Sequence, residues 1–322
     1  MGFFHRQPES GALDEWEKQM ISGMTADEVT EKFLKSEEFL KIAQLQQLLF
    51  VPPGHYYSPI VAPDTVQHLF LNQDCHYPLV GINIQHDKQL KAWETFLPYL
   101  YQIPFRWNKS PDFRYYYNNS AFSTFDSNIY FAMLLAYHPK KIIEIGSGYS
   151  SACALDVIEH YLKDTVNITF IEPYPDLLFS LLKTRDNQDI NILPIPVQKV
   201  DVKLFQELDA GDILFIDSTH ILKTGSDVHY ELLDILPALK SGVIIHIHDI
   251  FWPFEYPRSW VIDEGRSWNE VYALRAFLMY NNAFHIVFFN DYFAKTFSQR
   301  IQNDFPSILD GPGGSSMWLK KM

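Results

Sequence analysis

Two kinds of short segment in this sequence carry residues that could bind or activate a ligand. The first is EIGSGYSSA (residues 144–152), in which Gly146 and Gly148 let the backbone turn sharply and approach a ligand closely. A helix after such a turn presents free backbone amides, which favour an anionic group. Glu144 adds a carboxylate two residues before the first glycine. The segment predicts a ligand-binding turn, and a tight turn that holds no ligand is the alternative interpretation.

The second kind of segment is an apolar run that ends in an acidic side chain. Glu172 closes the first such run, Asp217 the second and Asp249 the third, and His220 follows Asp217 by three residues. Because the carboxyl ends of strands in an open parallel sheet line one crevice, we expect these side chains to face it. A carboxylate at Glu172 can accept both hydroxyls of an adenosine ribose. That feature alone does not separate a nicotinamide cofactor from S-adenosylmethionine, because both contain this ribose.

The elements that position these residues follow from the pattern of the chain after residue 123. Short apolar runs alternate with amphipathic stretches there, which is typical of a parallel sheet covered by helices. We expect strands over residues 141–145, 167–172, 190–195, 212–217, 242–248, 284–289 and 315–320. We expect helices over residues 150–162, 174–184, 201–208, 226–239 and 268–280. The long aromatic segment between residues 250 and 268 is expected to form a lid or binding loop, or a packing strap for the N-terminal segment.

The first 120 residues have a different character. Thr25 and Glu28 form a potential capping box for a helix that reaches Leu49, and a second helix is expected over residues 86–101. The aromatic-rich stretch 106–119 fits either a core or a binding wall. We therefore divide the chain into a mainly helical, substrate-selecting segment (1–120) and a catalytic domain (121–322).

Composition narrows the classes of partner. The 322-residue chain has a formal net charge of −13 and no basic run, which disfavours a nucleic-acid partner. Two cysteines are too few for a disulfide scaffold. No apolar run is long enough for a bilayer span and the first residues show no secretion signal, so we expect a cytoplasmic protein without a membrane partner. Assembly into a homo-oligomer is left open.

The order of the motifs resembles a known family. EIGSG, FIEPYP, ILFIDSTH and a strand ending in HD are similar, in that order, to the class I S-adenosylmethionine-dependent methyltransferases. The resemblance covers residues 120–322 and implies an α/β, Rossmann-like sheet of seven mostly parallel strands with helices on both faces and an antiparallel last strand. It further implies a set of cofactor-binding residues, in which Glu172 binds the ribose, Gln198 the adenine and Asp217 the methionine portion or a metal: Glu144, Gly146, Ser147, Gly148, Glu172, Gln198 and Asp217.

Within this superfamily the IDSTH and HIHD segments are similar to metal-dependent O-methyltransferases that act on macrolide sugars. That resemblance implies a divalent cation such as Mg²⁺ held by Asp217, His248 and Asp249, with His220 and Asp249 as the catalytic residues. His248 departs from the pattern, which has a carboxylate at this position, and imidazole is a softer ligand than magnesium prefers.

These observations predict an enzyme that transfers the methyl group of S-adenosylmethionine to a small-molecule acceptor. A hydroxyl acceptor is favoured because the segment around Asp217 supplies a base, His220, that could take its proton. N-methylation is the near alternative. A non-catalytic subunit that binds adenosylmethionine and a nicotinamide-dependent oxidoreductase are the alternatives from other classes.

Overall fold

The computed structural model describes residues 18, 20–36, 49–70, 79–163, 165–184, 186, 190–311 and 313–322. The chain divides into two compact units. The first comprises Met1–Leu71 with Ile262–Gly265, and the second comprises Asn72–Val261 with Arg266–Met322. No helix in these described ranges is long and apolar enough to cross a membrane.

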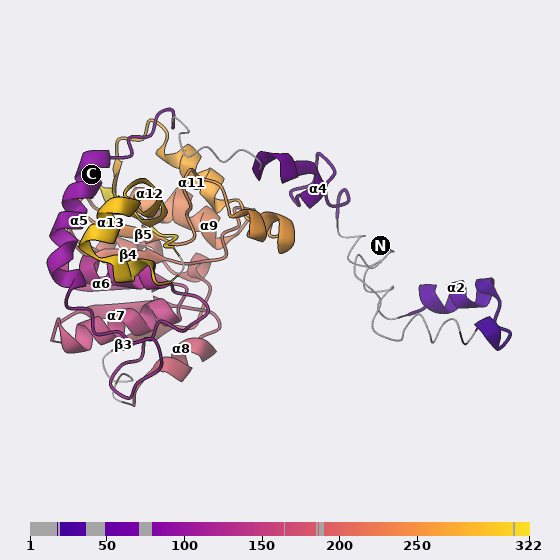
Figure 1. Cartoon of the computed structure of the whole chain (residues 1–322), viewed down its shortest axis with the longest axis horizontal. Coiled ribbons are helices and arrows are strands. Elements are labelled where there is room, and N and C mark those ends of the chain that lie inside the picture. Colours follow the sequence, from indigo (N-terminus) through magenta and orange to yellow (C-terminus); the bar gives the residue numbers. More distant parts are fainter. Residues whose placement is uncertain are drawn as a thin grey trace. The chain divides into compact units, whose positions relative to one another are not determined.

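The second unit is built on one sheet of seven strands, around which the helices lie (Figure 1). The strand order is β3-β2-β1-β4-β5-β7-β6. The first five strands along the chain are parallel, whereas β7 lies antiparallel between β5 and β6. The strands are β1 (Lys141–Ile145), β2 (Asn167–Ile171), β3 (Ile190–Leu193), β4 (Ile213–Ile216), β5 (Ile244–Ile247), β6 (Phe284–Phe289) and β7 (Met317–Lys321). All seven strands expected from the sequence are present.

The central strands are apolar on both faces, as a parallel sheet between two helical layers requires. Every residue of β4 and β5 is buried.

The helices of this unit are α5 (His86–Leu100), α6 (Thr124–Tyr137), α7 (Tyr149–His160), α8 (Asp176–Leu181), α9 (Asp227–Tyr230), α10 (Leu236–Ala238), α11 (Glu270–Leu278), α12 (Asn290–Thr296) and α13 (Ser298–Asp304). Shorter helical segments of this unit are η3 (Val197–Lys199), η4 (Val202–Glu207), η5 (Glu231–Ile235) and η7 (Pro306–Leu309). A further one, η6 (Ser259–Asp263), begins in this unit and ends within the residues 262–265 of the first.

Two helical features differ from the sequence-based expectation. Helix α6 is not among the helices expected from the sequence. It is buried along almost its whole length and therefore lacks the polar stripe that marks a surface helix. Its N-terminus is capped by Ser123, whose hydroxyl oxygen accepts the backbone N–H of Asp126. The helix expected over residues 226–239 is instead α9 and α10 joined by a π-helical turn, η5.

The division of the chain also differs from the expected boundary at residue 120. Helix α5 packs against α6, and it buries Trp93, Phe96 and Leu100 in the same hydrophobic core as the sheet. Residues from His86 onward therefore belong to the unit that carries the sheet. The substrate-selecting role of the first 120 residues stays a prediction.

In the first unit the described helices are α2 (Ala26–Leu34), α4 (Pro63–Val66) and η1 (Gln67–Phe70). The expected capping box is confirmed, because Thr25 Oγ1 accepts the backbone N–H of Glu28 and the Glu28 carboxylate accepts the backbone N–H of Thr25. The expected continuation of this helix to Leu49 falls largely on residues 37–48, which lie outside the described residues.

Candidate functional site

The glycine turn between β1 and α7 is shaped by the end of the neighbouring strand β4. Gly146 has a positive φ of 78°, and a Cβ atom on it would lie 1.8 Å from the carbonyl oxygen of Asp217. Gly148 is different, since its φ of 170° is extended and a Cβ atom would meet only the Leu177 side chain, at 3.1 Å. Only glycine fits at position 146, because both its conformation and its neighbour exclude a side chain.

A buried carboxyl lies directly below this turn. Glu144 is fully buried, and its Oε1 atom accepts hydrogen bonds from the hydroxyls of Ser150 (2.6 Å) and Ser151 (2.8 Å). Burial raises the pKa of Glu144 to about 8. Its Oε2 atom and the buried hydroxyl oxygen of Ser147 have no hydrogen-bond partner among the described residues. Buried polar atoms normally have partners, so these two atoms fit a site that a polar ligand completes.

Glu172 follows β2 and lies beside the turn, as the sequence predicted. Its Oε2 atom accepts the backbone N–H of Ser147 (3.1 Å), and its Oε1 atom accepts the backbone N–H of Tyr174 (2.8 Å). Each carboxylate oxygen can accept a further hydrogen bond, so the arrangement is compatible with ribose binding. Gln198 lies in η3, is exposed, and donates its side-chain N–H to the carbonyl oxygen of Gly225 (3.1 Å). Its predicted contact with adenine stays a prediction.

The three residues expected to handle a proton converge at the carboxyl ends of β4 and β5. The Nε2 atom of His220 lies 3.5 Å from a carboxylate oxygen of Asp217 and 3.5 Å from one of Asp249. His220 and Asp249 both have positive φ angles, 61° and 55°. Non-glycine residues in this conformation are uncommon and cluster at functional sites.

These contacts shift the pKa of each member of the cluster. Burial disfavours the charged form of His220, but hydrogen bonds with Asp217 and Glu270 outweigh it and raise the pKa of His220 well above its usual range. Burial by itself would raise the pKa of Asp217, but the charges of His248 and His220 hold it below the usual value. Burial raises the pKa of Asp249. The protonation of each of these side chains therefore depends on the charge of its neighbours.

Glu270, the first residue of α11, was not identified from the sequence. It is buried, and its Oε2 atom lies 2.8 Å from Nδ1 of His220. The backbone N–H groups of Asn269 and Glu270 both donate to the carbonyl oxygen of His220 (3.1 Å each). The N-terminus of α11 thus holds both the backbone and the ring of His220, and it directs Nε2 toward the two aspartates. An acid 50 residues from its partner leaves no local sequence signal.

His248 belongs to a buried network of its own. Its Nδ1 atom lies 3.3 Å from Ser316 Oγ and 3.3 Å from Nε2 of His246, and its Nε2 atom lies 3.7 Å from Asp249. His246 is fully buried and stacks on Phe215 with ring centroids 3.7 Å apart. His246 is thus a core histidine rather than part of the site.

The residues present do not fit the divalent cation that the resemblance implies. Magnesium prefers a set of oxygen ligands, whereas the ring nitrogens of His248 are engaged in the network above and Asp249 Oδ1 accepts the hydroxyl of Ser315 (3.0 Å). A metal ion also needs ligand atoms that lie close together. In the part of the chain that the structure describes, the ligand atoms of Asp217, His248 and Asp249 do not all lie within 4.8 Å of one another. No step of the chemistry is therefore assigned to a metal.

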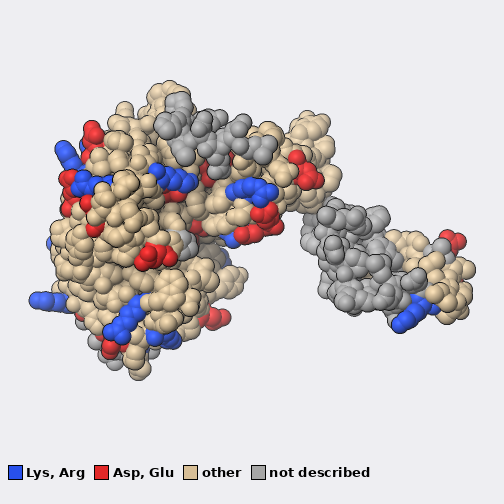
Figure 2. Space-filling model, in the orientation of Figure 1, with Lys and Arg blue, Asp and Glu red and all other residues tan. Residues whose placement is uncertain are grey.

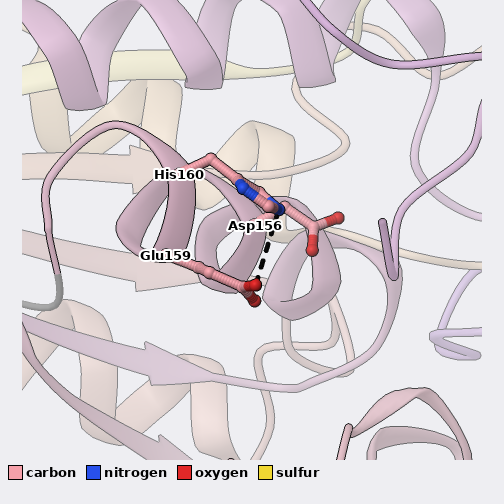
Figure 3. Close-up of side chains that lie close together, drawn as sticks. All are labelled: Asp156, Glu159 and His160. Atoms are coloured by element: carbon pink, nitrogen blue, oxygen red, sulfur yellow. Dashed lines mark ion pairs between the residues drawn. The ribbon is translucent and has the colours of Figure 1, made fainter. Parts of the chain in front are cut away.

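Three side chains on α7 do have potential ligand atoms within 4.8 Å of one another: Asp156, Glu159 and His160 (Figure 3). This cluster is already neutralised by cationic side chains. One guanidinium nitrogen of Arg114 lies 2.7 Å from both Asp156 and Glu159, and Lys183 lies 3.2 Å from Glu159. These contacts tie the segment around Arg114 to α7, so we interpret the cluster as structural.

Aromatic side chains form the wall beside His220. Trp268 packs on the His220 ring with centroids 4.5 Å apart, and Trp260 and Tyr256 pack in turn against Trp268. The Arg266 guanidinium lies over the rings of Trp260 and Trp268, 4.0 and 4.5 Å from their centroids. In the aromatic segment between residues 250 and 268, Tyr256 and Trp260 thus pack around Trp268 beside the site. Trp252 and Phe254 of the same segment pack instead against Phe289 of β6.

Comparison with known proteins agrees with this geometry. Residues 143–250, which contain the glycine turn and the predicted site residues of β2, β4 and β5, match the model of the Methyltransf_24 family, described as a methyltransferase domain. The seven-stranded, mostly parallel sheet with its antiparallel β7 is the one the resemblance implied. Residues 143–250 are therefore a methyltransferase domain, of the class I S-adenosylmethionine-dependent type that the motifs resemble.

Individual relatives add little about the reaction. An uncharacterised protein of Archaeoglobus fulgidus is 34% identical over 169 residues, which are 50% of this chain and 75% of the archaeal protein. The structure of the SAH-bound Podospora anserina methyltransferase PaMTH1 is 18% identical, with a TM-score of 0.38 over 85% of this chain and 100% of that one. The Methanococcus jannaschii fibrillarin pre-rRNA processing protein is 15% identical, with a TM-score of 0.33 over 59% of this chain and 73% of its own. Scores at this level carry no argument about the acceptor.

Proposed function

We propose that this methyltransferase acts on a hydroxyl group of a small molecule. The observation that supports the proposal is the position of His220 Nε2, 3.5 Å from both Asp217 and Asp249 at the carboxyl ends of β4 and β5. A hydroxyl must lose its proton when it is methylated, and this cluster offers a histidine and two carboxylates that can accept one. Packing alone does not require three such groups at one point of the crevice.

The reaction proposed is a direct displacement. An oxygen lone pair of the acceptor attacks the methyl carbon, the carbon–sulfur bond breaks, and the electron pair returns to sulfur, so the sulfonium becomes a neutral thioether. The hydroxyl proton passes to His220. Alignment of the two reactants supplies much of the acceleration, roughly 7–11 kcal/mol at best. Glu270 acts as a positioning residue, since it holds Nδ1 and so leaves Nε2 as the nitrogen that faces the acceptor.

The charge state of His220 gives this mechanism a pH dependence. A base must be unprotonated, and the neighbouring acids raise the pKa of His220 well above its usual range. We therefore expect the rate to rise with pH until it passes that raised pKa. The acidic members of the cluster also favour the cationic sulfonium over the neutral product.

Other parts of the proposal follow from the sequence analysis. The acceptor is a small molecule rather than a nucleic acid, the enzyme is cytoplasmic, and the first 120 residues help to select the acceptor. On the face shown in Figure 2, basic and acidic side chains of the second unit are interspersed, without a broad basic surface for a phosphate backbone. A divalent cation is not part of the proposal. N-methylation is the second candidate, because the same base could deprotonate an ammonium acceptor.

The experiment is to incubate the full chain with adenosylmethionine that carries a deuterated methyl group and with a pool of small hydroxylated and aminated molecules. Labelled products are then identified by mass spectrometry. We expect methyl ethers, formed about 10²- to 10⁴-fold more slowly by His220→Ala, which should bind adenosylmethionine normally. Labelled methylamines as the only products, or an undiminished rate in His220→Ala, would overturn the proposal.

A further inference from the structure

A cavity lies in the unit that carries the sheet, away from the glycine turn. Its volume is about 380 Å³, which is within the range of small-molecule sites. It is bounded by the end of α5, the segment 103–107, the first two turns of α6, and η7 with the residue after it. None of the residues predicted to bind cofactor or handle a proton lines it.

Aromatic side chains form most of the cavity wall. Trp107 is 52% exposed and Tyr101 is 65% exposed, so both present ring surface to a ligand. Phe305 meets the Tyr101 ring edge-on, with centroids 5.7 Å apart, and Phe105 and Tyr117 complete the wall. Large exposed aromatics beside a hollow provide stacking surface at a low cost in side-chain entropy.

The floor of the cavity carries buried polar groups with unused hydrogen-bonding capacity. Asn128 and Thr124 are 2% and 4% exposed, and both line the cavity. Asn128 Oδ1 accepts the hydroxyl of Tyr117 (2.7 Å). Within the described residues, however, no group bonds to the Asn128 amide nitrogen or to the Thr124 hydroxyl. Neither atom is among the buried side-chain atoms that lack a partner in the described residues, so both are accessible from the cavity and can bond to a ligand there.

The charge of the lining restricts the kind of ligand. Among the described residues, Asp310 is the only acidic residue that lines the cavity, and no Lys, Arg or His does. These lining residues therefore do not compensate an anion. The amide and hydroxyl of the floor can both donate, so they match an oxygen acceptor on the ligand, while the wall matches a ring.

We propose that this cavity binds a neutral, ring-bearing molecule through a hydroxyl or carbonyl oxygen, at a site separate from methyl transfer. Thr124 and Asn128 are four residues apart and share one face of α6. Asp126 lies between them in sequence and points elsewhere, where its carboxylate accepts the backbone N–H of Ser315 (3.0 Å). Ser315 in turn holds Asp249. The first turn of α6 thus stands between this cavity and the cluster around His220.

The test uses phenol and toluene as matched probes, because phenol carries a hydroxyl where toluene carries a methyl group and the two are otherwise identical. Binding to the full chain is measured by saturation-transfer NMR, with and without saturating adenosylmethionine. We expect saturable phenol binding that is tighter than toluene binding and independent of adenosylmethionine. Trp107→Ala should weaken phenol binding about tenfold. Thr124→Val keeps the side-chain shape and removes the donor, so it should weaken phenol binding about 2- to 10-fold and leave toluene unchanged.

Tyr280→Ala is the matched control, since Tyr280 is also a highly exposed aromatic (71%) but does not line the cavity. This variant should bind phenol normally, and all three variants should keep the adenosylmethionine affinity of the wild-type chain. The proposal fails if phenol binding is lost when adenosylmethionine saturates the protein, if Trp107→Ala leaves it unchanged, or if tetramethylammonium binds more tightly than phenol. Because the readout is binding rather than turnover, the result does not depend on the proposed O-methylation.

Discussion

The close approach of Gly146 to the end of β4 predicts a strong and position-specific effect of a single methyl group. In Gly146→Ala the new Cβ would meet the carbonyl oxygen of Asp217 at 1.8 Å, a distance at which the backbone must move. A non-glycine residue at this positive φ costs roughly 1–2 kcal/mol. Overpacking adds about 1–3 kcal/mol. The expected loss in the free energy of unfolding is therefore about 2–5 kcal/mol.

Gly148→Ala is the matched control on the same turn. Its φ is extended, and the nearest atom to a new Cβ is the end of the flexible Leu177 side chain at 3.1 Å. An alanine that causes no strain stabilises the folded protein by about 0.4–1 kcal/mol, because it lowers the conformational entropy of the unfolded chain. The net change in the free energy of unfolding should therefore stay within about 1 kcal/mol of zero. Urea unfolding followed by circular dichroism measures both variants. Equal losses at positions 146 and 148, or no loss at 146, would refute the argument.

Four further predictions concern the binding site and its protons. Glu172→Ala should weaken adenosylmethionine binding by about 1.5–3 kcal/mol in calorimetric titration, and unchanged affinity in a folded variant would contradict the ribose assignment. Glu270→Gln removes a charge that raises the pKa of His220, so the acidic limb of the pH–rate profile should move to lower pH; an unmoved limb would mean that Glu270 does not act through His220. Treatment with EDTA should leave turnover unchanged, whereas a loss that Mg²⁺ restores would reinstate the metal. Glu144 has a pKa of about 8 in the folded protein against a usual value of 4.5, so between these pH values unfolding releases its proton. The free energy of unfolding should therefore fall as pH rises from 4.5 to about 8. Glu144→Gln should remove that part of the slope in urea midpoints measured from pH 5 to 8, and identical slopes would show that Glu144 is ionised in the folded protein.

Much of the fold could be predicted because its signals are local in the sequence. Short apolar runs between amphipathic stretches identified all seven strands, since a strand buried on both faces is a continuous run of apolar residues. The same logic located the glycine turn and the acids at strand ends. Parallel strands bring their carboxyl ends together whatever the details of packing, so the sequence predicts that Asp217, His220 and Asp249 meet.

Other features depended on which elements pack together. Helix α6 has no amphipathic pattern because it is buried on nearly all sides, and its burial results from the packing of α5 against it. The pairing of Glu270 with His220 joins residues 50 positions apart, so only the docking of α11 creates it. The boundary expected at residue 120 misplaced α5 for the same reason.

The sequence by itself determined the class of the protein, because the motifs that define it lie within single strand-turn-helix units. Only the tertiary structure decided how those motifs are completed. Gly146 is expected to be irreplaceable because of the Asp217 carbonyl oxygen that follows β4. Two of the implied metal ligands, Asp249 and His248, instead contact Ser315 and Ser316, just before β7. The physical reason is that hydrogen bonds and steric contacts between distant segments form or fail with shifts of a few tenths of an ångström. Residue type and spacing do not encode positions that finely.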